Sequence, residues 1–258
     1  MKLVRILSLF VSLLLLFSLT SCLGRGKEVD LDKVYTADPY AYVSTHKGGD
    51  KCEYQSSLFN GDKYTIGIHV PVTGVEEADY FLSSLAETAE KDFKNAMSSL
   101  SRSEDGSKGV LYGDYLFNRT SKYVSVLMVF QTRLPEKDPT TEYYSVFYTL
   151  NDSKLMTLGD IFETPYLSPL ADLIISVLKE DQNLSLHMGE DYYSRLSLTD
   201  AATASFFMTD DALTLYFNGD TILTDYSSPL TFSFGKDLIN PLLPSGAYEL
   251  LYEDGAVG

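Results

Sequence analysis

Two runs of strand-forming residues meet at Asn60-Gly61, and this junction constrains the fold more than any other local feature. The runs extend from Cys52 to Phe59 and from Lys63 to Val72. Asn-Gly between two such runs is typical of a tight hairpin turn, because both residues accept a positive φ. Residues of the second run alternate, so one face of the strand is apolar and the other carries Lys63, Thr65 and His69. The pattern predicts an antiparallel hairpin.

A long amphipathic helix is predicted after this hairpin. Thr73 and Glu76 have the spacing of a capping box with Thr73 as N-cap, and apolar residues recur every three to four positions up to Leu100. Aromatic and β-branched runs predict further strands at 109–118, 122–134, 141–150, 204–208, 213–217 and 221–224, and a last one through Leu230 and Phe234. Other helices are predicted at 157–162, 166–179 and 237–243.

The order of these elements is strands, helix, strands, helix, strands, which indicates an α+β fold. We expect two small units of antiparallel sheet with helices packed on one face, and leave open whether the units share a sheet. The expected N-terminal unit covers residues 51–140 and the C-terminal unit residues 141–245. An acidic tail, residues 246–258, follows.

The first segment has the layout of a secretory signal peptide. Two positive residues precede an almost wholly apolar run from Ile6 to Leu19, which is shorter than the roughly 20 residues of a membrane-spanning helix. Leu19-Thr20-Ser21-Cys22 resembles the bacterial lipobox, which implies lipidation of Cys22 after removal of residues 1–21. The alternatives are an ordinary signal peptide with a chance cysteine, or an uncleaved anchor.

Residues 22–50 lack periodicity and are predicted to be a tether between a lipid anchor and the folded body. We therefore expect a lipid-anchored, extracytoplasmic protein of the bacterial cell envelope. The formal net charge is -16, which argues against nucleic acid as a partner. An acidic surface attracts cationic partners through long-range steering, although solubility alone also explains such a charge.

Cysteine and histidine usage argues against a disulfide scaffold and a metal site. If Cys22 is lipidated, Cys52 has no partner in the chain and is expected to be a small buried strand residue. His46, His69 and His187 do not pair at metal-ligand spacing. His46 is expected in the tether, His69 on an exposed strand face and His187 at a helix end or on the surface. The sequence thus predicts neither metal nor cofactor.

No catalytic motif is recognisable in the sequence. A Gly-x-Ser-x-Gly elbow and a phosphate loop are absent. Asp210-Asp211 is interpreted as a hairpin turn rather than as an acid pair. Tyrosine occurs in the doublets Tyr143-Tyr144 and Tyr192-Tyr193, and one member of the first is expected to be exposed on its strand. Exposed tyrosine suits contacts with proteins or glycans.

Two stretches carry a resemblance to a known family. They are YYSVFYTLNDSKLMTLGDIFE, from Tyr143, and SFFMTDDALTLYFNGDTILTDYSSPLTFSFGKDLI, from Ser205. They resemble the RsiV-like extracellular domain family, which comprises the extracellular domain of an anti-sigma factor and the region preceding the catalytic domain of the peptidoglycan deacetylase PdaC. Residues 141–243 carry the resemblance, and residues 52–135 match the preceding small domain more loosely. It implies an extracytoplasmic α+β module in which Thr157 and Asp160 cap a helix.

The resemblance also implies a binding function, because RsiV-like domains bind lysozyme, which is a basic protein. The loop Gly-Gly-x-His-Gly of that family is replaced here by the connection from Leu134 to Glu142. Our leading hypothesis is a non-catalytic lipoprotein that binds a lysozyme-like basic protein or peptidoglycan through residues that the sequence does not identify. The alternatives are an envelope hydrolase, with an acid pair assembled from distant positions, and a purely structural envelope component.

Overall fold

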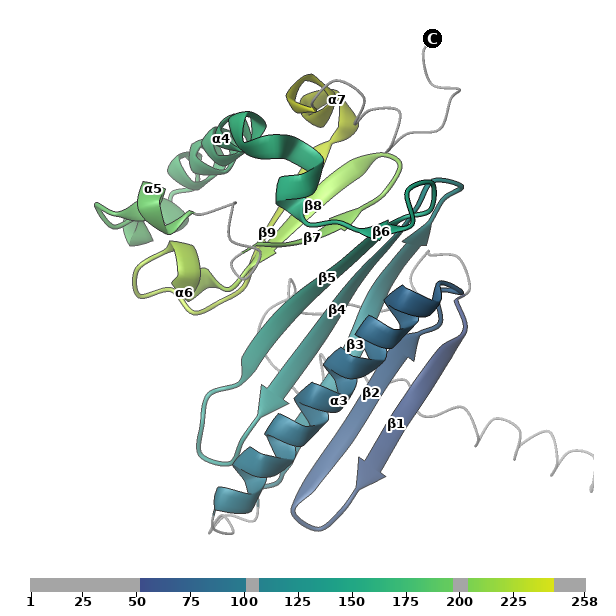
Figure 1. Ribbon diagram of the computed structural model, residues 1–258. Coiled ribbons are helices and arrows are strands. Elements are labelled where there is room, and N and C mark those ends of the chain that lie inside the picture. Colours follow the sequence, from purple (N-terminus) through teal and green to yellow (C-terminus); the bar gives the residue numbers. More distant parts are fainter. Residues whose placement is uncertain (1–51, 101–106, 197–203, 244–258) are drawn as a thin grey trace, which may run out of the picture.

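The computed structural model describes residues 52–100, 107–196 and 204–243, and it confirms the predicted α+β class. The expected signal segment, tether and tail, with Cys22 and His46, lie outside the described residues. A six-stranded sheet carries one long helix on one face (Figure 1). A three-stranded sheet with its own helices packs on the opposite face of the larger sheet, over β4 and β5.

The larger sheet has the strand order β1-β2-β3-β4-β5-β6. Its strands are β1 (Tyr54–Asn60), β2 (Tyr64–Pro71), β3 (Gly109–Arg119), β4 (Tyr123–Arg133), β5 (Thr140–Thr149) and β6 (Lys154–Leu155). The expectation of purely antiparallel pairing is wrong at one place, since β2 and β3 are parallel. The long helix α3 (Glu76–Ser99) is the crossover that such a parallel pair requires.

The predicted hairpin exists, but its turn differs from the predicted one. Asn60 still pairs with Thr65, and Gly61 N donates to Tyr64 O at 2.9 Å. Neither Asn60 nor Gly61 has a positive φ. The strands continue past the position expected for a two-residue turn, and the longer loop does not need the left-handed backbone that such a turn requires.

The start of α3 also differs from the prediction. Its N-cap is Val75, whose side chain caps nothing. Thr73 instead binds the side chain of a residue within the helix. Its N and its Oγ1 both donate to Asp79 Oδ1, at 2.7 and 2.6 Å. Asp79 thus takes the role that the spacing had suggested for Glu76.

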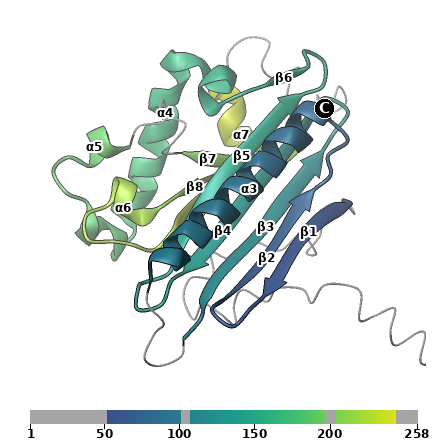
Figure 2. The same ribbon diagram turned by 60° about the horizontal axis from the view of Figure 1, so that its bottom comes forward.

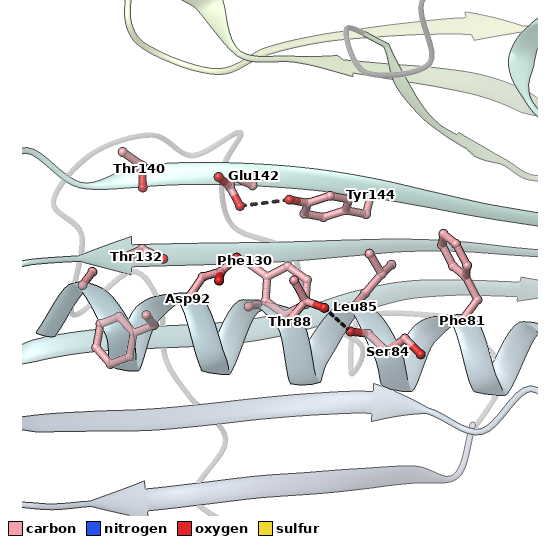
Figure 3. A pocket seen from close by; sticks show the side chains of 13 residues that line it. Phe81, Ser84, Leu85, Thr88, Asp92, Phe130, Thr132, Thr140, Glu142 and Tyr144 are labelled. Atoms are coloured by element: carbon pink, nitrogen blue, oxygen red, sulfur yellow. Dashed lines mark hydrogen bonds between the residues drawn. The ribbon is translucent and has the colours of Figure 1, made fainter. Parts of the chain in front are cut away.

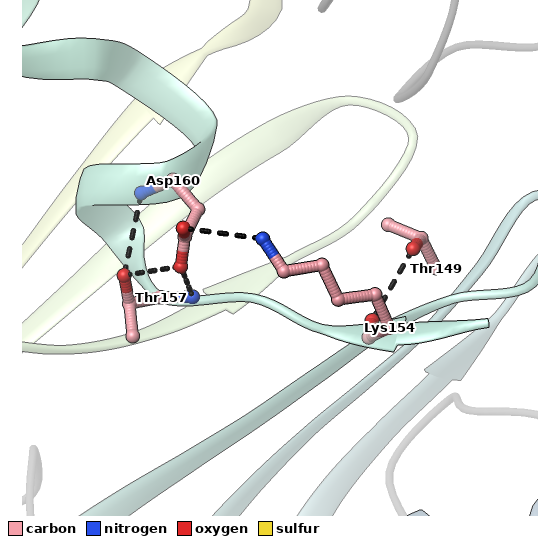
Figure 4. Close-up of polar contacts among 4 residues, drawn as sticks. All are labelled: Thr149, Lys154, Thr157 and Asp160. Carbon is pink, nitrogen blue, oxygen red and sulfur yellow. Dashed lines mark hydrogen bonds and ion pairs between the residues drawn. The ribbon is translucent and has the colours of Figure 1, made fainter. Parts of the chain in front are cut away.

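The second long helix, α4 (Leu158–Glu180), is one continuous helix where two were expected. Its predicted capping box is confirmed, since Asp160 N donates to Thr157 Oγ1 at 3.3 Å and Thr157 N donates to Asp160 Oδ2 at 2.8 Å (Figure 4). The Thr157 N–H and hydroxyl both donate to Asp160 Oδ2, at 2.8 and 2.7 Å, and with the Lys154 amine 3.4 Å away they hold the pKa of Asp160 below its ordinary value. A charged Asp160 at the helix N-terminus is also favoured by the helix dipole.

The smaller sheet consists of β7 (Ser205–Met208), β8 (Ala212–Phe217) and β9 (Leu230–Gly235) in antiparallel order. The strand predicted at 221–224 is wrong, because β8 pairs with β9 and the chain between them forms the short helix α6 (Gly219–Ile222). Thr221 N and Oγ1 both donate to Asn218 O and hold that turn. The remaining short helices are η1 (Leu184–His187), α5 (Tyr192–Arg195), α7 (Lys236–Ile239) and η2 (Asn240–Leu242).

Serine side chains join the two sheets. Ser125 Oγ on β4 accepts from Met208 N at 3.0 Å, and Ser205 Oγ donates to Tyr143 O on β5 at 2.7 Å. The expected boundary between residues 140 and 141 does not divide the sheets, because β5 pairs along its whole length with β4. The larger sheet therefore continues to β6, and the second unit packs on its face.

Candidate functional site

A groove of about 400 Å³ lies between α3 and the first half of β5 (Figure 3). Helix α3 contributes one wall, β4 the floor and β5 the other wall. The lining residues are Phe81, Ser84, Leu85, Thr88, Ala89, Asp92, Phe93 and Ala96 from α3, Phe130 and Thr132 from β4, and Thr140, Glu142 and Tyr144 from β5. All of them belong to the described part of the chain.

The alternation of β5 places its side chains in the groove. Val146 and Tyr148 are buried in the core beneath α3. Side chains two residues apart share a face of a strand, so Glu142 and Tyr144 point to the same side of the sheet. Closer to the start of β5 that face is exposed, because Thr140, Glu142 and Tyr144 are all accessible. The groove therefore lies next to the core beneath α3, where the same face of β5 is exposed.

Aromatic rings form the base and the ends of the groove. Phe130 is buried at its base, and the Tyr144 ring lies edge-on to it, with 5.8 Å between centroids and an interplanar angle of 68°. Phe81 and Tyr144 are 42% and 37% exposed, so both present ring surface that a ligand can reach. Exposed aromatic surface of this kind is favourable for stacking on sugars and for contact with cations.

Two carboxylates, Asp92 from α3 and Glu142 from β5, give the groove its charge. Tyr144 Oη donates to Glu142 Oε2 at 3.1 Å. Burial, with the negative charges of Glu142 and Asp92, raises the pKa of Tyr144 to about 12, so the phenol stays neutral at physiological pH. Thr88 Oγ1 donates to the Ser84 carbonyl at 2.8 Å.

No lysine, arginine or histidine is among the residues that line this groove. Its two carboxylates therefore have no basic neighbour within the lining, and its hydroxyls and rings add acceptors and π-faces. A lysine or arginine side chain would find opposite charge, hydrogen-bond acceptors and aromatic surface in one place. The groove is chemically suited to a cationic group.

The tyrosine doublet of β5 behaves as strand alternation predicts. Tyr144 is exposed in the groove, whereas Tyr143 points to the other face and packs on Tyr216 with 5.3 Å between centroids. In α5, Tyr193 is 55% exposed, and the Lys179 amine lies 5.2 Å from the centroid of the Tyr192 ring. Of these four residues, only Tyr144 lines the groove.

His69 is buried, which contradicts its predicted exposure. Its side chain is only 3% exposed, and its Nδ1 lies 3.9 Å from Oδ1 of Asp114 on the neighbouring strand. The Tyr54 ring lies against it, with 4.9 Å between centroids. The sequence correctly predicts that His69 lies on the face of β2 opposite to its apolar residues. At His69, however, that second face is also buried.

The remaining residues singled out in the sequence are structural. His187 ends η1, as expected, with its Nδ1 3.2 Å from Thr224 O. Asp210 and Asp211 form the predicted turn between β7 and β8. Cys52 lies before β1 and is half-buried, not a buried strand residue, and its Sγ donates to Val72 O at 3.3 Å. Burial raises the pKa of that thiol.

Within residues 52–100, 107–196 and 204–243, no group of three or more histidine, cysteine or acidic side chains is placed to hold a metal ion. In the same ranges, no helix combines the length and the apolar character needed to cross a membrane.

Sequence reasoning missed the groove because no sequence motif marks Asp92 or Glu142 as a site residue. Asp92 lies on the charged side of an amphipathic helix, and Glu142 lies near the start of a strand. The only signal was the Tyr143-Tyr144 doublet, which identified one wall. Helix α3 lies beside β5 because it is the crossover from β2 to β3. The sequence does not specify this crossover.

Comparisons with known proteins support the fold. No protein-family model matches the chain, and no curated protein matches it. A DUF3298 family protein from Pseudomonas aeruginosa PAO1 is similar in structure, with a TM-score of 0.52 and 12% identity over 79% of this chain and 96% of that one. A member of the same family from Bacteroides fragilis NCTC 9343 aligns with a TM-score of 0.49 and 14% identity, over 75% and 94% of the two chains.

The names of these two proteins state no ligand or activity, so the likeness concerns fold alone. RsiV-like domains are related to the DUF3298 family, and the fold shared with the Pseudomonas aeruginosa protein agrees with the sequence resemblance at that coarser level only. Membership of the RsiV-like family itself stays a prediction. The chain shares its fold with the DUF3298 family protein from Pseudomonas aeruginosa.

Proposed function

We propose that the chain is a non-catalytic lipoprotein of the bacterial cell envelope that binds a cationic, lysozyme-like protein in the groove between α3 and β5. Its location rests on the lipobox-like segment ending at Cys22. Its binding role rests on the groove and on the net charge of -16. No cofactor takes part in this proposal.

The observation that carries the proposal is the combination of Asp92, Glu142 and exposed aromatic rings in one groove that lacks a basic lining residue. A lysine or arginine inserted there gains charge-assisted hydrogen bonds and contact with Phe81 or Tyr144. The net negative charge of the chain raises the rate of encounter with a basic protein. Peptidoglycan, which offers sugar rings and amino groups, is the other ligand that this chemistry accommodates.

The test is retention of lysozyme and of purified peptidoglycan by the immobilised chain, residues 22–258 with Cys22→Ser. We expect lysozyme to be retained at about 0.01 M salt and released toward about 1 M, where the Debye length falls from about 30 Å to about 3 Å. Glu142→Lys should weaken lysozyme binding by about tenfold or more, because it places like charges opposite each other.

Asp172→Lys is the matched control, since it makes the same charge change at an exposed position on α4 outside the groove. It should reduce binding far less than Glu142→Lys does. Equal losses from both variants would mean that net charge alone drives retention. Retention of neither lysozyme nor peptidoglycan would remove the binding function.

An envelope hydrolase acting on glycan is the second candidate, and the two carboxylates of the groove favour it. Glycosidases use a pair of acidic residues on either side of the scissile bond. Asp92 and Glu142 come from different elements and line the same groove. Release of reducing sugar ends from peptidoglycan, abolished by Glu142→Gln, would support hydrolysis; binding without any release supports the non-catalytic role.

A further inference from the structure

A hydrogen bond from Tyr144 fixes one of the two carboxylates in the groove between α3 and β5. Tyr144 Oη donates to Glu142 Oε2 at 3.1 Å, and the Tyr144 ring is itself held edge-on against the buried Phe130. Burial, with the charges of Glu142 and Asp92, raises the pKa of Tyr144 to about 12, so the phenol keeps the proton that it donates. Within the described residues no other hydrogen bond engages Glu142, and its Oε1 is available to a ligand.

Asp92 brings a second negative charge to the same part of the groove from the opposite wall. It is exposed on α3, and no described residue holds its carboxylate in a hydrogen bond or ion pair. After burial and Glu142, its charge is a further cause of the raised pKa of Tyr144, so Asp92 acts close to the phenol that holds Glu142. Figure 3 shows both carboxylates at the same level along the groove. A cation between the two walls would therefore meet both of them.

The groove changes from apolar to acidic along its length. Phe81 and Leu85 lie toward one end, whereas Asp92 and Glu142 lie toward the other (Figure 3). Figure 2 shows α3 running along the larger sheet with β5 beside it, so the apolar and acidic parts follow one another in the direction of the helix. A side chain with a long apolar stem and a charged tip matches this order of surfaces.

A lysine side chain fits these acceptors better than an arginine does. The lysine ammonium is a compact charge whose N–H groups point in different directions, so it can donate to Glu142 and Asp92 at once. The arginine guanidinium is a planar fork that binds best when both oxygens of one carboxylate are free. Glu142 offers that fork a single unengaged oxygen, because Tyr144 occupies the other. A fork placed on Asp92 alone would lose the contact with Glu142.

We propose that the groove prefers a lysine side chain to an arginine, with the ammonium between Asp92 and Glu142 and with Tyr144 as the positioning residue that sets this preference. The inference rests on the proposed binding function, and it specifies the chemical group of the partner that the groove recognises. Tyr144 acts through Glu142, because its hydroxyl holds Oε2 and leaves Oε1 for the ligand. The four-carbon stem of the lysine then lies on the apolar part of the groove.

Guanidinated lysozyme tests the preference. Treatment with O-methylisourea converts lysine side chains to homoarginine and keeps their positive charge, so attraction by net charge is the same for both forms. The measurement is calorimetric titration of the chain 22–258 with Cys22→Ser at about 0.15 M salt, where the Debye length is about 8 Å. We expect native lysozyme to bind about tenfold more tightly than the guanidinated form, which corresponds to the loss of one hydrogen bond to a charged group.

Tyr144→Phe tests the positioning role, because it keeps the ring against Phe130 and removes only the hydroxyl. With both oxygens of Glu142 released, the difference between the two forms of lysozyme should fall toward equality. Tyr193→Phe, at an exposed position on α5 outside the groove, is the matched control and should keep the full difference. Equal midpoints of urea unfolding for the two variants would exclude a loss of folding as the cause.

The possible results separate this inference from the binding function on which it rests. If both forms of lysozyme bind equally well, or the guanidinated form binds more tightly, the lysine preference is overturned and the binding function stands. A difference that persists in Tyr144→Phe would overturn the role of Tyr144. Binding of neither form would remove the binding function, and the lysine preference with it.

Discussion

Phe147→Ala should lower the free energy of unfolding by about 3–5 kcal/mol, a large part of the about 5–15 kcal/mol that stabilises a typical domain. Phe147 is 1% exposed and stacks on Tyr123, with 4.9 Å between ring centroids. It also contacts Phe206 of β7, at 5.8 Å, and therefore connects the two sheets. Alanine at this position would leave a cavity at the junction of the sheets, which neither sheet can close without moving.

Urea unfolding followed by circular dichroism measures this loss as a lower midpoint at an unchanged slope. Tyr144→Ala is the matched control, because it removes an aromatic ring from the same strand at a position that is 37% exposed. We expect it to cost much less. Equal costs for the two substitutions would mean that the junction between the sheets contributes no more than the open groove does.

The second large effect is expected at Cys22, where Cys22→Ser should abolish lipid attachment. A fatty chain gains about 0.8 kcal/mol for each methylene group that it buries, and stable anchoring takes more than one chain. A serine hydroxyl is not the thiolate nucleophile that the modification uses. The variant should therefore incorporate no fatty acid label and keep residues 1–21 attached.

Labelling with a radioactive or clickable fatty acid, followed by mass measurement of the mature chain, tests this prediction. Cys52→Ser is the control, because it removes the other cysteine of the sequence and should leave label and processing intact. A Cys22→Ser chain that still takes up label, or is still cut before residue 22, would contradict the lipid anchor and the envelope location with it.

Local features could be predicted from the sequence, because their causes are local. The capping box at Thr157 and Asp160 depends on residues three positions apart, and it is present as predicted. Strand alternation correctly separated Tyr143 from Tyr144. The β1–β2 hairpin was also found, although its turn contains no positive φ. In each case, the residues that form the feature are neighbours in the chain.

Features set by packing could not be predicted. The burial of His69 depends on Asp114 and Tyr54, which the strand order brings to it from other strands. The parallel pairing of β2 and β3 follows from the crossover through α3. The residues of either strand alone do not indicate this crossover. The helix at 219–222 replaced a predicted strand because β8 pairs with β9 instead. The groove itself forms only when the strand order and the crossover place α3 beside β5.

The central claim is that a cationic partner occupies the groove between α3 and β5, and hydroxyl-radical footprinting tests it most directly. This method reads the solvent exposure of individual aromatic side chains in the free chain and with lysozyme bound. Our account predicts that oxidation of Phe81 and Tyr144 falls in the complex, while that of Tyr193, 55% exposed on α5, does not change. A formed complex in which Phe81 and Tyr144 oxidise as fast as in the free chain would contradict it.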